Sequence, residues 1–329
     1  MTTRVFTGLK PTGQLQIGNY LGAIRPLLDM AAEPANELIV SIVDLHALTV
    51  EHEPARLRAL TIEMAATLLA CGLDERATVF VQSSVPAHTE LNYLLESTAT
   101  YGEMTRMIQF KEKSRGRESV RLSLLTYPAL MTADILAYQT DVVPVGDDQR
   151  QHLELTTALA RRFNARYRTV FTIPRGVTPA GTARVKDLRD PTAKMGKSGG
   201  DGTGVLFLRD EPDVLVAKVR RAVTDGDASL SYAPENRPGV ANLAALLGAL
   251  TGTSPERAVE GLRGAAALKA AVAEAVVETL APIQSRFKEF ASDPAALLAR
   301  LRCGAEAVAG DALKTAASAR DAMGLLCVH

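Results

Sequence analysis

The 329-residue sequence lacks tryptophan altogether, and its other aromatic residues make up only 5% of the chain. Chance can produce that absence in a chain so poor in aromatics, and it excludes no fold. A net charge is lacking as well, because 37 Lys and Arg residues balance 37 Asp and Glu residues. A protein that coats nucleic acid without specificity is usually basic overall. Any contact with RNA must therefore depend on local basic patches.

Cysteines and long apolar runs are also scarce. Cys71, Cys303 and Cys327 lie far apart without a Cys-x-x-Cys motif, which argues against a disulfide framework and a structural zinc site. Apolar runs such as residues 38–43 are far shorter than the ~20 residues of a membrane span. The N-terminus has no charged lead followed by an apolar stretch. We therefore expect a soluble cytoplasmic enzyme with no membrane segment and no secretory signal.

The first half of the chain alternates between strand and helix signals. Short β-branched and apolar runs predict strands at residues 4–7, 38–43, 78–81 and 141–145. Apolar residues at helical spacing and helix-bounding Pro and Gly predict helices at residues 18–28, 54–72, 130–138 and 147–167. Such alternation is typical of an α/β fold with a doubly wound, Rossmann-type parallel sheet.

The character of the sequence changes after about residue 205. Strand signals end, and Ala, Leu, Arg and Glu dominate stretches such as 262–280 and 295–323. We expect a Rossmann-type catalytic domain over residues 1–205, with a helical insert around 100–140, followed by an all-helical region over 206–329.

Ligands of doubly wound sheets bind beyond the carboxyl ends of the strands. This rule places Thr7-Gly8, Asp44 and Val145-Gly146 at the rim of the expected site.

Residues 12–22 follow the first strand and contain glycines where a ligand would approach the backbone. Gly18 and Gly22 leave room for a ligand, and a helix N-terminus after a strand favours phosphate. Gln16 and Asn19 are three residues apart, so their side chains could donate hydrogen bonds to one phosphate chain. A plain strand–turn–helix joint has the same pattern, and both interpretations stay open for this segment alone.

A second polar segment, Lys194-Met-Gly-Lys-Ser198, is followed by a glycine-rich loop. Two lysines in such a loop suit the covering of a triphosphate and the neutralisation of charge on its leaving group. A solvated surface loop is the simpler interpretation of this segment by itself.

A third polar segment surrounds Asp147 and Asp148 at the expected start of a helix. Helix capping alone would explain both carboxylates, although Asp148 and Gln149 would also suit the hydroxyls or the amine of a ligand. His46 and His152 are lone histidines, which are more often structural than catalytic. No Gly-x-Ser-x-Gly motif occurs, so a hydrolytic triad is not indicated.

Together, the first two segments resemble the "HIGH" and "KMSKS" boxes of class I aminoacyl-tRNA synthetases. Across nearly its whole length the chain resembles the bacterial tryptophanyl-tRNA synthetases. The stretches that carry this resemblance occur in the order of the family: Gly8–Gly13, Ile17–Ala23, Met107–Lys113, Thr126–Ile135 and Pro144–Leu155.

The resemblance implies a two-step reaction. L-tryptophan and ATP give tryptophanyl-adenylate and pyrophosphate, and the aminoacyl group then passes to tRNA(Trp). It also implies Mg²⁺ on the phosphates and a symmetric homodimer with tRNA spanning both subunits.

The resemblance further implies an ATP site. Its residues hold the phosphates, the adenosine or the ribose: Lys10, Thr12, Gln16, Gly18, Asn19, Gly146, Asp148, Gln149, Lys194, Met195, Lys197 and Ser198. The catalytic group within and beside it consists of Lys194, Lys197, Ser198 and Lys113. No protein ligands to a metal are implied.

The implied tryptophan site has apolar walls and a few polar groups: Phe6, Gly8, His46, Tyr127, Met131, Asp134, Val143, Val145 and Gln149. In this family, the counterpart of Asp134 accepts the indole N–H. Phenylalanine is expected to leave Asp134 unpaired, and an unpaired buried acceptor discriminates better than a missing methylene does.

Four positions depart from the pattern of the family. Gly196 replaces the usual serine, Gly199 a frequent aspartate, Lys10 the glutamine of many bacterial relatives, and Gln16 the commoner His or Thr. These departures bear on the rate and the inhibitor profile rather than on the reaction class. An auxiliary second copy beside a housekeeping enzyme therefore stays open.

Residues 104–121 carry six basic and two acidic side chains, a local net charge of +4 in a neutral chain. A solvated helix face is the usual interpretation of such a run. Given the resemblance, the run would suit the phosphates of a tRNA acceptor stem, and the helical region would read the anticodon.

Two other functions remain as alternatives. A tyrosine-activating enzyme would share the fold, and a silent paralogue would bind tRNA or a partner without catalysis. Such a paralogue should have lost Lys194, Lys197 or the pair Gly18 and Asn19, and this chain retains all four.

Overall fold

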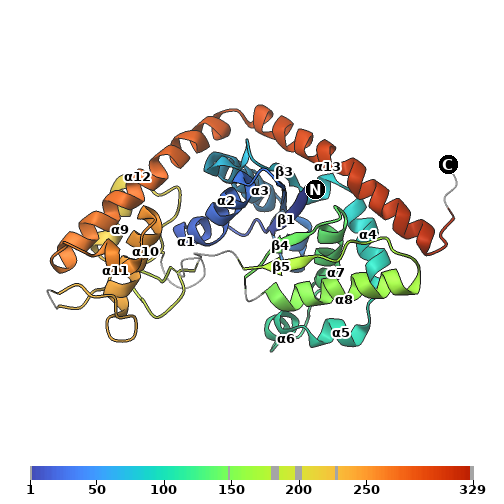
Figure 1. The fold of residues 1–329 in the computed structure, drawn as a ribbon, viewed down its shortest axis with the longest axis horizontal. Coiled ribbons are helices and arrows are strands. Elements are labelled where there is room, and N and C mark those ends of the chain that lie inside the picture. Colours follow the sequence, from blue (N-terminus) through green and yellow to red (C-terminus); the bar gives the residue numbers. More distant parts are fainter. Residues whose placement is uncertain (1, 147–148, 179–184, 197–201, 227–228, 327–329) are drawn as a thin grey trace.

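The computed structural model describes residues 2–146, 149–178, 185–196, 202–226 and 229–326 (Figure 1). At its centre lies a five-stranded parallel sheet with the order β3-β2-β1-β4-β5. The strands are β1 (Thr3–Leu9), β2 (Asn36–Ile42), β3 (Thr78–Val81), β4 (Val142–Pro144) and β5 (Arg175–Val177). The first four confirm the predicted strands. β5 was not predicted, because Arg-Gly-Val has no apolar run to mark it.

Helices cover both faces of the sheet because successive strand side chains point to opposite sides. On one face Val5 and Val40 pack with the helices that follow β1 and β2, and on the other Phe6 and Ile39 pack with later helices. The first group comprises α1 (Ile17–Asn19), η1 (Tyr20–Ile24), α2 (Arg25–Ala32), α3 (Pro54–Leu68) and η3 (Leu69–Leu73). The second comprises α4 (Ala87–Glu96), α7 (Leu122–Leu136) and α8 (Arg150–Arg166). The predicted doubly wound α/β architecture is confirmed.

Some helix boundaries differ from the prediction for identifiable reasons. α7 begins at Leu122, eight residues before the predicted start, and contains Pro128. A proline lacks the N–H that a helix interior uses, and this hides the first turns of α7 in the sequence. The predicted stop at Gly72 is confirmed, since its φ of 105° is a left-handed conformation that favours glycine.

Short elements connect the sheet to the site. They are η2 (Leu45–Thr49) after β2, η4 (Gln82–Ser84) after β3, and α5 (Tyr101–Arg106) and α6 (Ile108–Ser114) before α7. The predicted insert at 100–140 is therefore helical in the structure.

The C-terminal part is helical, as predicted, and comprises α9 (Pro212–Arg220), α10 (Pro238–Thr251), α11 (Pro255–Ala258), α12 (Gly264–Ser292) and α13 (Pro294–Ala322). In Figure 1, α12 and α13 form an arch over the molecule, which begins at the α9–α11 cluster and passes over β3 and α4. The domain boundary at residue 205 stays a prediction.

The last helix, α13, covers the open edge of the sheet at β3 (Figure 1). A Cβ at Gly304 would lie only 2.0 Å from the carbonyl oxygen of Val79, so glycine permits this close approach. An ion pair of 2.6 Å between Arg4 and Asp311 ties the same helix to β1. The cover removes an exposed strand edge that could pair with another chain.

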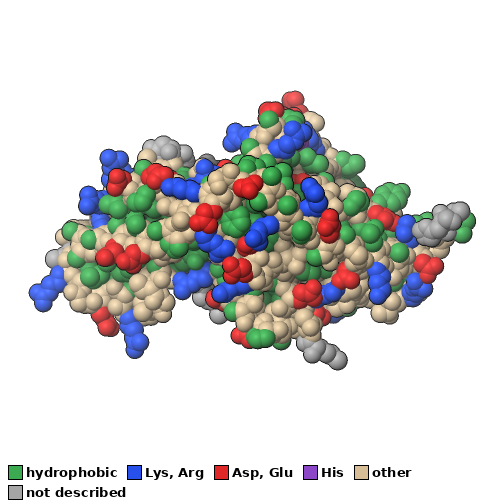
Figure 2. Space-filling model, turned by 90° about the horizontal axis from the view of Figure 1, so that it is seen from above, with side chains coloured by type: hydrophobic (Ala, Val, Ile, Leu, Met, Phe, Trp, Pro, Cys, Tyr) green, Lys and Arg blue, Asp and Glu red, His purple; other side chains and the backbone are tan. Residues whose placement is uncertain are grey.

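The surface agrees with the balanced composition. On the face seen in Figure 2, basic and acidic side chains alternate without a large continuous patch of either sign. In the described part of the chain, no helix is long and apolar enough to span a membrane. Cys71 is buried and unpaired, Cys303 is exposed and unpaired, and Cys327 lies outside the described residues.

Candidate functional site

A cavity of about 350 Å³ opens at the carboxyl ends of β1 and β4, where a doubly wound sheet is expected to bind its ligand. Its lining comes from β1, β4, η2, α6 and α7: Phe6, Thr7, Gly8, Lys10, Val43, His46, Thr49, Gln109, Lys113, Leu124, Tyr127, Met131, Asp134, Ile135, Val143, Pro144, Val145 and Gln149. All the residues predicted to contact tryptophan belong to this set. Thr7 and Val145, predicted at the rim, also line it.

One predicted rim residue points elsewhere. Both carboxylate oxygens of Asp44 accept hydrogen bonds from Ser83, one from its backbone N–H and one from its hydroxyl. The strand-end rule places Asp44 at the correct edge of the sheet but does not fix the direction of its side chain.

The apolar part of the cavity is built on the strands. Phe6, Val143 and Val145 are nearly fully buried. A Cβ at Gly8 would lie 2.9 Å from Val43 Cγ1 and would occupy this space, so glycine keeps the floor open. The ring of Tyr138 stacks behind Phe6, with 5.7 Å between the ring centroids. The result is a rigid apolar slot suited to a flat side chain.

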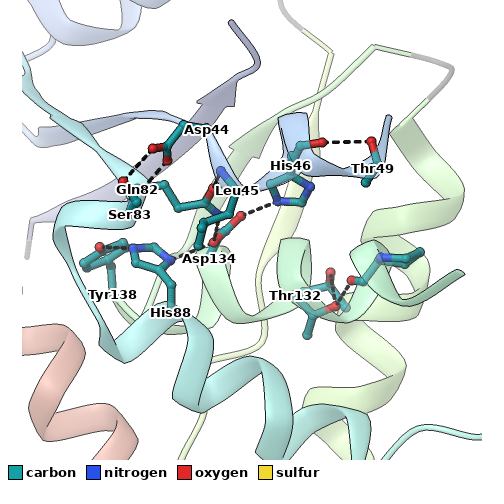
Figure 3. A network of polar contacts seen from close by, with 12 residues as sticks. Asp44, Leu45, His46, Thr49, Gln82, Ser83, His88, Thr132, Asp134 and Tyr138 are labelled. Carbon is teal, nitrogen blue, oxygen red and sulfur yellow. Dashed lines mark hydrogen bonds and ion pairs between the residues drawn. The ribbon is translucent and has the colours of Figure 1, made fainter. Parts of the chain in front are cut away.

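Asp134 is the ionisable group at the inner end of this slot, and it is 1% exposed (Figure 3). Its Oδ2 accepts a hydrogen bond from His46 Nε2 at 2.8 Å. Its Oδ1 accepts one from Gln82 Nε2 at 2.6 Å and one from His88 Nδ1 at 2.6 Å. Burial by itself would raise the pKa of Asp134, but the hydrogen bonds from His46 and His88 outweigh it and hold the pKa well below its usual range. Asp134 is therefore a charged acceptor at the inner end of the apolar slot.

This donor set corrects one expectation. Phenylalanine would not leave Asp134 unpaired, because three protein donors already bind it. Each carboxylate oxygen accepts about two hydrogen bonds. Among the described residues, Oδ1 has two donors and Oδ2 has one, so a single acceptor position on Oδ2 is left for a ligand. Selectivity would then depend on one acceptor position and not on the whole carboxylate.

Sequence reasoning missed Gln82 and His88, the two donors to Oδ1. Gln82 directly follows the predicted strand at 78–81, so the strand-end rule could have identified it. Its Oε1 also accepts from the backbone N–H of Leu45, which links β3 to the segment that carries His46. His88 had no comparable signal.

Two lysines lie at the open, polar end of the cavity. Lys10 Nζ donates to Thr49 Oγ1 at 3.1 Å, and Lys113 Nζ donates to Gln109 Oε1 at 2.9 Å. Burial, and next the charge of Lys113, lower the pKa of Lys10. A cation that is already crowded by another cation gains from a neighbouring anion. This end of the cavity therefore suits a carboxylate or a phosphate.

Tyr127 also lines the cavity. Its hydroxyl donates to Gln109 Oε1 at 3.1 Å and lies 2.6 Å from Nε2 of the buried His152. Burial raises the pKa of Tyr127 to about 12, so the hydroxyl keeps its proton. The ring lies 5.9 Å from Lys113 Nζ, as a cation–π neighbour.

The two signature segments contact each other. Gln16 is buried, and its side chain caps the helix that follows it by accepting from the N–H of Gly18. The same amide donates from Nε2 to the carbonyl oxygen of Met195 at 3.1 Å. A Cβ at Gly18 would meet Gln16 Oε1 at 2.8 Å, so glycine allows this fold of the side chain. Gln16 therefore connects the segments instead of pointing into the cavity.

The rest of the predicted ATP set divides into two groups. Lys10 and Gln149 line the cavity, whereas these described residues do not: Thr12, Gln16, Gly18, Asn19, Gly146, Lys194 and Met195. Met195 is buried, and the neighbouring Lys194 is exposed. Asp148, Lys197 and Ser198 lie outside the described residues, as does Gly199.

The basic run at residues 104–121 lies on α5, α6 and the segment before α7. All six of its basic side chains are exposed: Arg106, Lys111, Lys113, Arg115, Arg117 and Arg121. Only Lys113 also lines the cavity among them.

Comparison with known proteins gives a consistent picture. The family model described as "tRNA synthetases class I (W and Y)" matches residues 1–281. The chain is 52% identical to Tryptophan--tRNA ligase 1 of Streptomyces coelicolor, with 98% of each chain covered. It is 46% identical to Tryptophan--tRNA ligase of Corynebacterium glutamicum, with 98% of this chain and 95% of the relative covered.

Solved structures agree. The chain is similar to tryptophanyl-tRNA synthetase from Mycoplasma pneumoniae, with a TM-score of 0.87, 34% identity and 99% of each chain covered. It is also similar to the Campylobacter jejuni tryptophanyl-tRNA synthetase complexed with ADP and tryptophan. The TM-score is 0.84 and the identity 27%, and the match covers 98% of this chain and 100% of that one.

Proposed function

The chain belongs to the class I tRNA synthetases of the tryptophan and tyrosine family and has tryptophan–tRNA ligase activity, and we propose that the cavity at β1 and β4 is where it activates L-tryptophan. The observation that carries this proposal is Asp134, a buried charged acceptor with one open position at the inner end of an apolar slot. An indole side chain offers a flat apolar surface with a single N–H donor. The amino and carboxylate groups of the amino acid would then lie toward Lys10, Lys113 and Gln149.

The chemical step is an in-line displacement. A carboxylate oxygen of tryptophan forms a bond to the α-phosphorus of ATP, and the bond from that phosphorus to the bridging oxygen of pyrophosphate breaks. The protein has to align the reactants and neutralise the charge that moves to pyrophosphate. We assign that second task to Lys113, Lys194, Lys197 and Ser198, with Lys10 near the attacking carboxylate. Mg²⁺, which keeps most of its waters in such sites, would accompany ATP without protein ligands and would add positive charge beside these lysines.

We also assign Gln16, expected at the ATP, a positioning role. Its amide joins the helix N-terminus after β1 to the backbone of the second box, so it would position Met195 and the adjacent lysines relative to the phosphates. Gly18 and Asn19 would remain the phosphate-facing members of that box.

Binding of tRNA uses other surfaces in this proposal. The exposed basic run at 104–121 would bind acceptor-stem phosphates, and the helical region from residue 206 would bind the anticodon. The α4–α7 segment carries large exposed apolar side chains, Tyr93, Tyr101, Ile108 and Leu122, which would suit contact with a second copy of the chain in a homodimer. Since tRNA is a substrate, we expect the enzyme in the cytoplasm.

ATP–pyrophosphate exchange without tRNA tests the proposal directly. We expect exchange with tryptophan and at most about 1% of that efficiency with tyrosine or phenylalanine. Equal exchange with tyrosine would overturn the assignment of the slot to an indole. A folded sample inactive with all three amino acids would favour a silent paralogue.

Replacing Gln16 by alanine should lower kcat for this exchange about tenfold and change KM for tryptophan less than twofold. The variant loses one cap and one buried contact to Met195, but nothing in the cavity changes. Gln16→Glu keeps the cap and loses the donor to Met195, so it separates the two contributions. A rise in KM for tryptophan with kcat unchanged would contradict the positioning role.

A further inference from the structure

Behind Asp134, and away from the cavity, a chain of two buried side chains continues the hydrogen-bond network (Figure 3). His88 Nδ1 lies 2.6 Å from Asp134 Oδ1, and His88 Nε2 lies 2.6 Å from Tyr138 Oη. His88 and Tyr138 have no exposed surface, and neither lines the cavity. They therefore cannot touch a bound amino acid and would act only through Asp134.

The charge of Asp134 and the raised pKa of Tyr138 favour one arrangement of the protons among Tyr138, His88 and Asp134. Burial, and next the charge of Asp134, raise the pKa of Tyr138 far above its usual range, so its hydroxyl keeps its proton. A charged Asp134 can only accept, so His88 Nδ1 carries a proton toward Oδ1, and a tyrosine hydroxyl that keeps its proton can donate it to His88 Nε2. Nδ1–H then donates to Asp134 Oδ1. The tyrosine hydroxyl thus selects the tautomer of His88 that supports the carboxylate.

The carboxylate is held in one orientation as a result. Gln82 and His88 fill Oδ1 from two different helical segments, η4 and α4. A rotation of the carboxylate would break both bonds in a buried site, where polar groups left without partners are costly. Oδ2 therefore stays turned toward His46 and the cavity.

The ring of Tyr138 is also fixed. It stacks on Phe6 and meets Phe80 edge to face, with 5.9 Å between the latter centroids. Phe6 is a wall of the slot. Tyr138 thus supports both the apolar wall of the slot and, through His88, the acceptor Asp134 at the inner end of the slot.

We propose that His88 and Tyr138 are positioning residues for amino-acid selection, which fix Asp134 so that a single lone pair of Oδ2 faces the indole N–H. This inference rests on the proposed function, in which Asp134 accepts that N–H. It assigns specificity to two residues outside the cavity. Their contribution should appear only for substrates that carry the N–H.

The test compares two amino acids of nearly the same shape, tryptophan and β-(3-benzothienyl)alanine, in which sulfur replaces the indole N–H. The ratio of their kcat/KM values in ATP–pyrophosphate exchange measures the acceptor alone. Tyr138→Phe keeps the ring and removes the hydroxyl, and we expect this ratio to fall about fivefold relative to the unmodified enzyme. Tyr167→Phe, the same change beside Phe163 at the end of α8, should leave the ratio unchanged.

The outcomes separate the possibilities. A ratio unchanged in Tyr138→Phe would overturn the proposal, because a general loss of folded enzyme would lower both rates and not their ratio. An unmodified enzyme that does not prefer tryptophan over the analogue would show that the proposed function of Asp134 fails, independently of Tyr138.

A second measurement examines the ring nitrogens of His88 directly in the unmodified enzyme. The chain has five histidines, so ¹⁵N-histidine labelling gives a simple spectrum, and His88→Gln assigns the His88 signals by their loss. In the unmodified enzyme we expect the His88 signals to show a protonated Nδ1 and an unprotonated Nε2. Two protonated nitrogens would show that Tyr138 does not donate to His88, and would overturn the proposed role of Tyr138.

Discussion

Replacing Asp134 by asparagine should lower kcat/KM for tryptophan in ATP–pyrophosphate exchange about 100-fold. The same change should alter kcat/KM for benzothienylalanine less than fivefold. The 100-fold loss for tryptophan corresponds to about 2.8 kcal/mol. This is the size expected for the loss of a hydrogen bond to a charged acceptor in a buried site. The second is small because the analogue has no N–H to lose.

The existing donors decide how the asparagine would lie. Gln82 Nε2 and His88 Nδ1 both donate to Oδ1, so the amide oxygen must take that position. The NH₂ group then takes the place of Oδ2 and points toward the cavity. A donor would face the indole N–H, so the variant would repel tryptophan where the unmodified enzyme binds it. His46 would have to change its tautomer to accept from the new NH₂ group.

Asp321→Asn, on α13 in an ion pair with Arg168, makes the same chemical change at the surface and should leave both rates unaltered. A thermal melt of each variant shows whether folding is affected. An equal loss of kcat/KM for tryptophan and for the analogue in Asp134→Asn would mean that Asp134 supports the fold of the slot and does not accept a hydrogen bond from the indole N–H.

Local sequence patterns predicted the sheet and its binding edge well. The apolar β-branched runs at 38–43 and 78–81 mark β2 and β3 because buried parallel strands are apolar on both faces. β5 carries no such run and lies at an edge, so only its pairing with β4 defines it. The strand-end rule gave Thr7, Gly8 and Val145 correctly. It could not show that Asp44 turns to Ser83, because direction depends on the neighbouring strand.

The polar network of the site was harder to predict for a physical reason. Asp134, His88 and Tyr138 come from α7, α4 and the turn after α7, and no periodicity relates them. Resemblance named Asp134 and His46, whereas the donors to Oδ1 became visible only in the folded chain. The same holds for Gln16. Its spacing from Asn19 suggested a phosphate contact, but a partner 179 residues away determines where its side chain points.

The other large effect is expected at the opposite end of the cavity. Lys113→Ala should lower kcat for ATP–pyrophosphate exchange about 100-fold and change KM for tryptophan less than twofold. Removal of one preorganised donor from the site of developing charge has this order of effect on kcat. Lys113 suits that role because it is exposed on α6 yet lines the cavity, and its hydrogen bond to Gln109 and its contact with Tyr127 hold it at the polar end.

Lys10 is a poorer candidate for this role, because burial, and next the charge of Lys113, lower its pKa. Lys113→Arg should recover most of the rate, since it keeps the charge, and Lys314→Ala on the outer side of α13 should change nothing. A loss that appears in KM for tryptophan and not in kcat would place Lys113 at the bound amino acid and not at the leaving group. In that case the neutralisation of pyrophosphate would be left to Lys194, Lys197 and Ser198.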